Sequence, residues 1–463
     1  MKTRANPKAE AFFAGMKGRT VAVCGIGHNN TPVVHQFLQA GAQVWACDRR
    51  TREQLGDTAA QLEQAGAQLH LGESYLQGLD RAELILRTPG MKPYLPEFEA
   101  ARAAGIPVTS EMELFFELCP APIYGVTGSD GKTTTTSVIA GMLEAAGRRV
   151  FLGGNIGRPL LPVVGEIRAE DAAVVELSSF QLTRMKQSPQ VAVITNVAPN
   201  HLDWHTDMAE YVEAKGNLIR YQGPDDRAVL NADNPYTRQF ASLVRGKPYA
   251  FSRLHPVEAG AFLAEDGWLC MAEKGTVTRV MRSEDIRIAG AHNRENFLAA
   301  IAAVWGVVPT AAMRRFAREF TGIAHRCELV RERGGVRWIN DSIGTSPSRT
   351  IAGLEAFGQP VILIAGGYDK HIPYDPLGKA AATTVKAAIL MGATADAIEK
   401  AIRKYGEVPV LRVADMEEAV READTLAGKG DIVFMSPASA SFDRYKNFEE
   451  RGDHFKRLVA ALP

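Results

Sequence analysis

The chain has 463 residues, of which 46% are hydrophobic and 23% charged, a composition typical of a globular protein and not of a disordered or fibrous one. Its 53 basic and 53 acidic residues give a formal net charge of zero, so composition offers no support for a nucleic-acid-binding surface. No apolar run approaches the roughly 18 residues that span a bilayer, and the polar N-terminus lacks a signal core. Five scattered cysteines without a Cys-x-x-Cys pair favour reduced thiols, and therefore the cytoplasm.

Strand-like and helix-like stretches alternate along the chain, which predicts βαβ units and parallel sheets. The length predicts about two to four domains, and the alternation restarts twice, so we expect three α/β domains. The proline-containing stretch 117–125 and the stretch 320–330 are the predicted joints. The predicted domains are therefore residues 1–116, 117–322 and 323–463.

Within these regions the predicted strands are short apolar runs. The first region has them at 20–27, 43–48, 82–90 and 106–114, with a helix at 31–41. The second has them at 122–128, 148–155, 172–179, 191–197 and 227–234, followed by a β-meander at 261–281 and an amphipathic helix at 292–306. The third has them at 336–342, 360–367, 387–392 and 431–438, with a helix at 394–406.

A phosphate-binding loop is predicted where the strand at 122–128 ends. The stretch "GVTGSDGKTTTT" lacks glycine at Val126, which the common nucleotide loop requires, but Gly128 and Gly131 flank a tight turn that opens a helix. Glycines there let backbone N–H groups approach an anion, and the N-terminus of the helix favours negative charge. Lys132 would neutralise phosphate, and the Thr133 hydroxyl would ligate Mg²⁺. The alternative is an ordinary glycine turn.

Acidic and histidine side chains follow two other predicted strands. Glu176 ends the strand in "AAVVELSS" and is the candidate metal ligand, although an isolated acid there is usually a turn or cap residue. In "NHLDWH", His201 is a candidate for a second Mg²⁺ or for substrate, while Asp203 and His205 fit structural roles. A zinc site is conceivable, but no third-ligand motif accompanies it.

Near the N-terminus, "VCGIGHNN" and Asp48 imitate a dinucleotide fingerprint. Asn30 occupies the place of the third glycine, so the pattern supports a nucleotide-like ligand without specifying NAD. A dehydrogenase using Gly25 and Gly27 is an alternative that would require bound NAD.

Nine motifs in order through nearly the whole chain resemble the Mur ligases: "GVTGSDGKTTTT", "GGNIG", "ELSSFQL", "NHLDWH", "AHNRENFLAA", "FTGIAHRCELV", "INDSIGTSP", "AGGYDK" and "SPASASFDRYKNFEERGDHF". The family's ATP loop is Gly-x-x-Gly-Lys-Ser/Thr, which accounts for Val126. Within the family, Gly366–Lys370 and the C-terminal motif look most like the members that add D-glutamate to UDP-N-acetylmuramoyl-L-alanine. The Asp-Asn-Pro-Arg element of the members that add diaminopimelate or lysine is missing from the last region.

The resemblance implies a Rossmann-like N-terminal domain for the UDP substrate, a central mononucleotide-binding domain for ATP and a Rossmann-like C-terminal domain for D-glutamate. It also implies an ATP-dependent acid–D-amino-acid ligase of peptidoglycan precursor synthesis that works through an acyl phosphate. We expect a cytoplasmic monomer that uses two Mg²⁺ ions and has no nucleic-acid or membrane partner.

Site residues carry over from the resemblance by position. Lys132, Glu176, His201, Lys215 and Lys370 are expected to be catalytic, and Thr133, Glu176, His201 and a carbamylated Lys215 to bind metal. Without the family, Lys215 would be an ordinary surface lysine. The expected ATP contacts are Gly128, Ser129, Asp130, Gly131, Lys132, Thr133, Thr134, Asn293, Asn296, Arg326 and Asp341. The expected substrate contacts are Asp48, Arg50, Thr88, Asn155, Ser178, His201, Thr345, Lys370, Ser441, Phe442 and Phe448; for Phe448, core packing is an equal alternative.

Two departures from the family pattern alter these expectations. Many members carry lysine where this chain has Ile343, and Arg349 is the candidate to replace that charge. "GHNNTP" replaces a more glycine-rich N-terminal continuation, which leaves Asp48, Arg50 and Thr88 as candidates for the uracil site. The rival functions are a related amide ligase that takes another amino acid or a folate, and a non-catalytic nucleotide-binding protein descended from the ligases.

Overall fold

The computed structural model describes residues 6–27, 30–199, 204–288, 290–369 and 372–463. Two compact units divide the chain, the first comprising residues 1–283 and 294–316, and the second 284–293 and 317–463. No helix in the described ranges is both long and apolar enough to cross a membrane.

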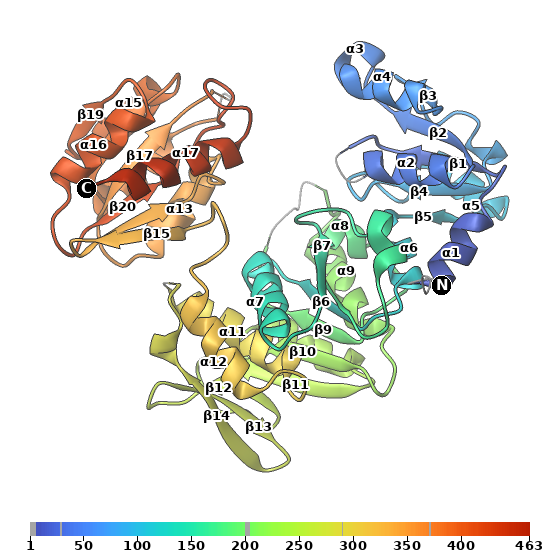
Figure 1. Ribbon diagram of the computed structural model, residues 1–463, viewed down its shortest axis with the longest axis horizontal. Helices are drawn as coiled ribbons and strands as arrows, with labels where there is room; N and C mark the ends of the chain where they lie inside the picture. Colours follow the sequence, from blue (N-terminus) through green and yellow to red (C-terminus); the bar gives the residue numbers. More distant parts are fainter. Residues whose placement is uncertain (1–5, 28–29, 200–203, 289, 370–371) are drawn as a thin grey trace. The chain divides into compact units, whose positions relative to one another are not determined.

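The first unit begins with a parallel sheet in the order β3-β2-β1-β4-β5 (Figure 1). Its strands are β1 (Thr20–Cys24), β2 (Gln43–Asp48), β3 (Gln68–Leu71), β4 (Leu84–Arg87) and β5 (Val108–Thr109). The accompanying helices are α1 (Pro7–Ala14), α2 (Asn30–Gln39), α3 (Arg52–Leu55), α4 (Asp57–Gln64), α5 (Pro96–Ala103) and α6 (Glu111–Leu118). The stretch 106–114, predicted as a strand, is one only at Val108–Thr109, because the Ser110 side chain accepts the Glu113 N–H and starts α6.

The second sheet of this unit has the order β14-β13-β12-β11-β10-β9-β6-β8-β7. Its strands are β6 (Ile123–Thr127), β7 (Val150–Gly154), β8 (Ala172–Glu176), β9 (Val191–Ile194), β10 (Arg227–Asn231), β11 (Lys247–Ser252), β12 (Gly260–Leu263), β13 (Trp268–Glu273) and β14 (Thr276–Arg282). The strands from β7 to β12 run parallel, whereas β12, β13 and β14 are antiparallel, which confirms the predicted meander.

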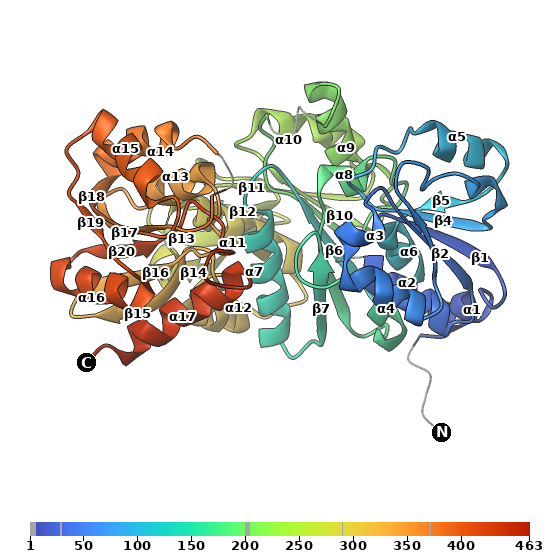
Figure 2. The ribbon, with the colours of Figure 1, turned by 90° about the horizontal axis from the view of Figure 1, so that it is seen from above.

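Helices border this second sheet. They are α7 (Lys132–Ala145), α8 (Ser179–Leu182), α9 (Met208–Arg220), α10 (Pro235–Gln239), α11 (Ala291–Val304) and α12 (Thr310–Glu319). Helix α7 packs against β6, β7 and β8 (Figure 2). Helix α11 was predicted to be amphipathic, but Phe297 to Val304 are each at most 1% exposed, so its second half is buried on every side.

Buried polar side chains join the two sheets of the first unit. The Asn6 amide donates to the carbonyls of Leu118 and Val164, at 3.0 and 2.9 Å. Glu111, 6% exposed, accepts the N–H groups of Leu160 and Leu161. One apolar cluster also runs from α1 and β1 through α6 to β9 and α9, so the two predicted domains share a core.

The second unit is built on a sheet in the order β15-β16-β20-β17-β18-β19, with β15 antiparallel and the other pairs parallel. Its strands are β15 (Glu328–Arg333), β16 (Val336–Asn340), β17 (Val361–Gly366), β18 (Val385–Met391), β19 (Val410–Arg412) and β20 (Ile432–Met435). Its helices are α13 (Pro347–Glu355), α14 (Asp375–Thr384), α15 (Ala395–Tyr405), α16 (Met416–Leu426) and α17 (Phe448–Ala461). Apolar clusters lie on both faces of this sheet, which explains why β17 is apolar throughout.

Candidate functional site

The predicted phosphate loop connects the buried strand β6 to α7. Gly128 has φ 154°, and a Cβ there would lie 1.8 Å from the Thr195 hydroxyl oxygen. Gly131 has φ 77°, and its Cβ would lie 2.4 Å from the Asn296 amide oxygen. Both glycines are therefore required by close approach as well as by conformation.

The Lys132 side chain curls back over this loop. Its Nζ donates to the carbonyls of Gly128 and Ser129, at 3.0 and 2.9 Å. Of the following threonines, Thr133 and Thr134 are half-buried, whereas Thr135 and Thr136 are fully buried and bonded to Asn296 and to the Lys132 carbonyl. The two threonines nearest the start of the helix, Thr133 and Thr134, are thus the more exposed ones.

The residues that follow β9 brace the loop from the neighbouring strand. Thr195 Oγ1 donates to the Asp130 carbonyl at 2.6 Å, and Asn196 Oδ1 accepts the Asp130 N–H at 2.9 Å. Ser129 Oγ bonds the Ala198 carbonyl at 2.9 Å. These contacts fix the backbone before any anion binds, which lowers the entropic cost of binding.

Glu176 ends β8 beside β6 and is 1% exposed. Its Oε1 accepts a hydrogen bond from the Asn155 amide at 2.8 Å, while Oε2 is buried with no hydrogen-bond partner in the described ranges. A buried carboxylate oxygen without a donor is costly, and such an atom is a candidate ligand for a cation. Asn155, expected to touch substrate, thus also orients the carboxylate.

Lys215 on α9 is also 1% exposed, so it is not the surface lysine that its local sequence suggests. Its Nζ donates to the Gly128 carbonyl at 2.8 Å and lies 4.5 Å from the centre of the Tyr211 ring. Burial, reinforced by the positive charge of Lys132, lowers the pKa of Lys215 well below its ordinary value. The two lysines therefore meet at one loop carbonyl.

Two predicted ATP contacts in the second unit lie close together. Asp341, just after β16, is 4% exposed, and its Oδ1 accepts the Cys327 N–H at 3.2 Å, one residue beyond Arg326. Burial raises the pKa of Asp341 to about 6, against hydrogen bonds from Ser436 and Cys327 and the charge of Arg326, which lower it.

The predicted D-glutamate contacts come from two loops of the second unit. Ser441 is buried, Phe442 is 65% exposed and packs edge-on against Tyr368, and Thr345 is half-buried. Phe448 opens α17 and meets the His325 ring edge-on at 5.9 Å. Arg349, the candidate replacement for the missing lysine, donates from Nη1 to the Ile343 carbonyl at 3.2 Å.

Sequence reasoning missed Arg451, which joins these two loops from α17. This guanidinium is 2% exposed and bonds Ser342 Oγ and the carbonyls of Ser342, Ser439 and Ala440. Only its place in the C-terminal motif could have singled it out. Tyr211, whose hydroxyl bonds Ser129 Oγ at 2.9 Å, was missed as well.

The predicted uracil-site residues meet at the ends of β1, β2 and β4. Asp48 Oδ2 accepts the Ile26 N–H at 2.7 Å, and Arg50 pairs with the Asp48 carboxylate at 2.9 Å. Burial raises the pKa of Asp48, but the bonds from Arg50 and Ile26 outweigh it and lower the pKa. Thr88 packs against Gly25, where a Cβ would lie 2.4 Å from the Thr88 methyl group.

The remaining residues that the sequence singled out are placed as follows. His201, Asp203 and Lys370 lie outside the described residues. Ser178 caps α8, accepting the Gln181 N–H, and buried His205 bonds Ser179 Oγ at 2.9 Å. Asn293 is buried at the start of α11.

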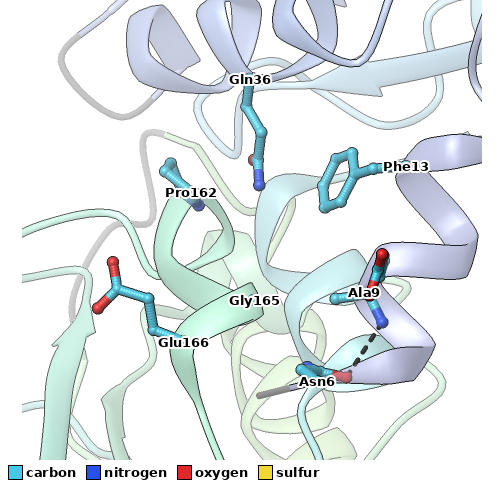
Figure 3. A pocket seen from close by; sticks show the side chains of 8 residues that line it. Asn6, Ala9, Phe13, Gln36, Pro162, Gly165 and Glu166 are labelled. Atoms are coloured by element: carbon cyan, nitrogen blue, oxygen red, sulfur yellow. Dashed lines mark hydrogen bonds between the residues drawn. The ribbon is translucent and has the colours of Figure 1, made fainter. Parts of the chain in front are cut away.

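No set of three or more His, Cys, Asp or Glu side chains in the described ranges could hold a metal by itself, which gives no support to a zinc site. A pocket of about 310 Å³ lies between α1, α2 and the 3-10 helix Leu161–Glu166 (Figure 3). Asn6, Phe13, Gln36 and Glu166 are among its lining residues, and none of the expected site residues is. It belongs to the junction between the two sheets of the first unit.

Three family descriptions match the chain in succession. "Mur ligase MurD-like, N-terminal domain" matches residues 19–110, "Mur ligase middle domain" residues 126–304 and "Mur ligase, glutamate ligase domain" residues 325–439. Solved structures of similar fold include UDP-N-acetylmuramate-alanine ligase of Thermotoga maritima, with TM-score 0.57 and 17% identity over 96% of this chain and 100% of that one. UDP-N-acetylmuramoylalanyl-D-glutamyl-2,6-diaminopimelate--D-alanyl-D-alanyl ligase of Acinetobacter baumannii has TM-score 0.58 and 14% identity over 99% of this chain and 98% of that one.

Relatives of higher identity extend along the whole chain. A UDP-N-acetylmuramoylalanine--D-glutamate ligase of Acetivibrio thermocellus is 50% identical over 99% of both chains. Proteins of the same name from Symbiobacterium thermophilum and Clostridium novyi are 48% and 44% identical, over 97% and 96% of this chain and 100% and 98% of theirs. A glycine-bounded loop before α7, a buried carboxylate at the end of the neighbouring strand and three matching α/β domains in this order thus occur together with full-length similarity, and the chain belongs to the Mur ligase family.

Proposed function

We propose that this chain joins D-glutamate to UDP-N-acetylmuramoyl-L-alanine by an amide bond in peptidoglycan precursor synthesis, consuming ATP and releasing ADP and phosphate. Relatives that carry this enzyme's name are 44–50% identical along the whole chain. The structural observation that carries the proposal is the glycine-bounded loop before α7, together with Glu176 on the strand next to β6, whose buried Oε2 has no hydrogen-bond partner among the residues that the structure describes.

The proposed reaction has two steps. A terminal carboxylate oxygen of the UDP substrate attacks the γ-phosphorus of ATP, which forms an acyl phosphate and releases ADP. The amine nitrogen of D-glutamate then attacks the acyl carbon, and the resulting tetrahedral intermediate expels phosphate as the amine loses its proton. Because anions crowd such a site, positioning and neutralisation of charge supply most of the catalysis.

The loop is suited to hold the phosphates of ATP. Residues 128–131 lead into the N-terminus of α7, where the helix favours negative charge, while the N–H groups of Ser129 and Asp130 already donate to Asn196 and fix the turn. The ammonium group of Lys132 donates to two carbonyls of the loop, so it lies next to the place where the loop would hold phosphate. Thr133 and Thr134 at the helix start, and Asn296 beside Gly131, complete the proposed ATP contacts on the first unit.

The residues near the loop fit Mg²⁺, which prefers carboxylate and hydroxyl oxygens. Glu176 Oε2 is a buried oxygen with no hydrogen-bond partner among the described residues, and Thr133 is the second residue of α7. We propose that both hold Mg²⁺ together with His201, and that the metal neutralises phosphate charge when bound.

Lys215 is proposed to carry the carbamate that the family resemblance implies. A lysine amine attacks the carbon of CO₂ only when unprotonated, and it loses a proton as the N–C bond forms. The lowered pKa of Lys215 makes the neutral amine more available than that of an ordinary lysine. The product is a carboxylate near the phosphate loop, which would add an oxygen ligand for a second Mg²⁺ ion.

The amino acid is proposed to bind the last domain, residues 323–463, through Thr345, Lys370, Ser441, Phe442 and Phe448. D-Glutamate carries two carboxylates and an amine, so it needs cations and hydroxyl donors, and Arg349 adds a guanidinium at the Thr345 loop. Residues 117–322 form the proposed ATP domain.

The UDP substrate is proposed to bind residues 1–116 through Asp48, Arg50 and Thr88. Asn155 and Ser178 of the central domain would contact the muramoyl part. The five cysteines are free, as suits the reducing cytoplasm in which we place the enzyme.

Product analysis with purified protein, ATP and UDP-N-acetylmuramoyl-L-alanine tests the proposal. D-Glutamate should give ADP, phosphate and the amide product, while L-glutamate, D-aspartate and meso-diaminopimelate should give little. Turnover without preference for D-glutamate would favour a related ligase with another acceptor. Lys132→Ala should abolish ADP formation; a protein that binds ATP but forms no ADP with any acceptor would favour the non-catalytic alternative.

A further inference from the structure

Arg326 sits in an unusual stretch of backbone at the start of the last domain. The residues on both sides of it, His325 and Cys327, have φ values of 64° and 42°, in the left-handed region that side chains other than glycine rarely adopt. Such conformations persist only where surrounding contacts impose them, and they occur often at ligand-binding sites. The contacts that impose this one can be identified.

Three groups of the stretch bond the last residue of β16 and the segment that follows it. The His325 carbonyl accepts the Ile343 N–H at 3.0 Å, and the Cys327 N–H donates to Asp341 Oδ1 at 3.2 Å. The His325 ring meets the Asn340 amide, with Nδ1 and Nδ2 3.1 Å apart. These bonds hold Arg326 in a fixed relation to Asp341.

The partners of Asn340 determine the protonation of His325. Asn340 Oδ1 accepts the Ser342 N–H at 3.1 Å, so the NH₂ group faces His325 Nδ1 and Glu328 Oε2. His325 Nδ1 must therefore accept, and the ring proton lies on Nε2, 3.7 Å from Asp453 Oδ1. Burial and the positive charge of Lys456 lower the pKa of His325, while the nearby carboxylates of Glu328, Asp453 and Glu449 raise it by less. The net lowering favours the neutral ring, in which Nδ1 can accept a hydrogen bond.

The ring occupies a closed space formed by α17. His325 is 7% exposed and packs against Phe448, and a Cβ on Gly452 would lie 2.1 Å from Nδ1. Glycine at this helical position is therefore required by the imidazole, although glycine weakens a helix.

We propose that His325 is a positioning residue for ATP: its neutral imidazole accepts a hydrogen bond from Asn340 and holds Arg326 and Asp341 in the arrangement that ATP requires. The inference rests on the proposed function, through the ATP contacts assigned to Arg326 and Asp341. His325 itself touches neither ATP nor the reacting atoms.

Two amide substitutions separate acceptor function from packing. In His325→Asn the amide oxygen can take the place of Nδ1, and asparagine tolerates positive φ. In His325→Gln the same amide lies one methylene farther out and cannot reach Asn340 in the same way. Loss of one buried hydrogen bond should raise the KM for ATP about tenfold in His325→Gln, whereas His325→Asn should stay within about threefold of the wild type.

The KM for the UDP substrate is the internal control, because its proposed site lies in the other unit; it should stay unchanged in both variants. A second variant acts on the ring without altering residues 325–327 themselves: Gly452→Ala should displace the imidazole of His325 and also raise the KM for ATP about tenfold. Equal KM values for ATP in His325→Gln and the wild type would overturn the proposal. So would an equal rise in the Asn and Gln variants, since that would indicate packing alone.

Calorimetric titration of the full chain with a non-hydrolysable ATP analogue separates this inference from the proposed function. Wild-type protein that binds the analogue but does not use D-glutamate would refute the proposed acceptor and leave the role of His325 to be decided by the variants. Analogue affinity that is unchanged in His325→Gln and Gly452→Ala would refute the role of His325, whatever the acceptor.

Discussion

Replacing Arg451 with methionine tests whether one buried guanidinium organises the proposed amino-acid site. Its donors reach Ser342 and the carbonyls of Ser439 and Ala440, so it ties the loop that carries Thr345 to the loop before Phe442. No carboxylate lies within ion-pair distance in the described ranges, and burial lowers the pKa of Arg451 to about 10.

The expected magnitude follows from the acceptors left behind. Ala440 O keeps a bond from the Tyr368 N–H at 2.9 Å, whereas the carbonyls of Ser342 and Ser439 lose the donor that Arg451 supplies. At about 1–2 kcal/mol for each buried carbonyl that loses its donor, Arg451→Met should destabilise this unit by about 3 kcal/mol. The KM for D-glutamate should rise at least about tenfold, because both loops lose their common anchor.

Hydrogen exchange measured by mass spectrometry on peptides of β16, β20 and α17 reports the stability of this unit separately from the rest of the chain. Steady-state kinetics give the KM values for D-glutamate and the UDP substrate. Arg457→Met is the matched control, because Arg457 is an exposed arginine on the same helix. Equal protection and equal KM values in the two variants would refute the reasoning.

Three further substitutions probe other buried polar groups. Asn6→Ala removes the cap of α1 and two hydrogen bonds to buried carbonyls, so we expect the free energy of unfolding to fall by about 2–3 kcal/mol. Limited digestion should show faster proteolysis of α1, and an unchanged digestion pattern would contradict this. Lys215→Met should abolish turnover yet raise the free energy of unfolding at pH 6, because a lysine whose native pKa is lowered destabilises the fold at every pH below its ordinary pKa. The gain in the free energy of unfolding should shrink as pH rises toward 10. Urea titrations in which this gain does not depend on pH would refute the reasoning. The raised pKa of Asp341, about 6 against 3.8, means that the native state binds the extra proton between these values, so the free energy of unfolding should fall by about 3 kcal/mol as pH rises from about 3 to about 7. An Asp341→Asn variant with the same slope in urea titrations would disprove that origin.

The sequence alone determined the features that depend on local pattern. Apolar runs such as β17 identified most buried strands, because strands of a parallel sheet covered on both faces are apolar throughout. Glycine spacing at Gly128 and Gly131 located a tight loop before a helix, since both conformation and close approach require glycine there; its role in binding phosphate remains a prediction. Motif order gave the family and the three-domain fold, both confirmed; the boundaries at 117 and 323 and the site residues remain predictions.

Only the tertiary structure decided which polar side chains are buried and what they meet. The local sequence of α9 suggests that Lys215 is a surface lysine. In the fold, its Nζ donates to the carbonyl of Gly128, which lies 87 positions earlier in the chain. Arg451 meets Ser342 across 109 positions, and the second half of α11 is buried on all sides although its sequence suggests one polar face. Helical periodicity describes one element at a time, whereas burial depends on every element packed around it, so long-range contacts of this kind appear only once the chain is folded.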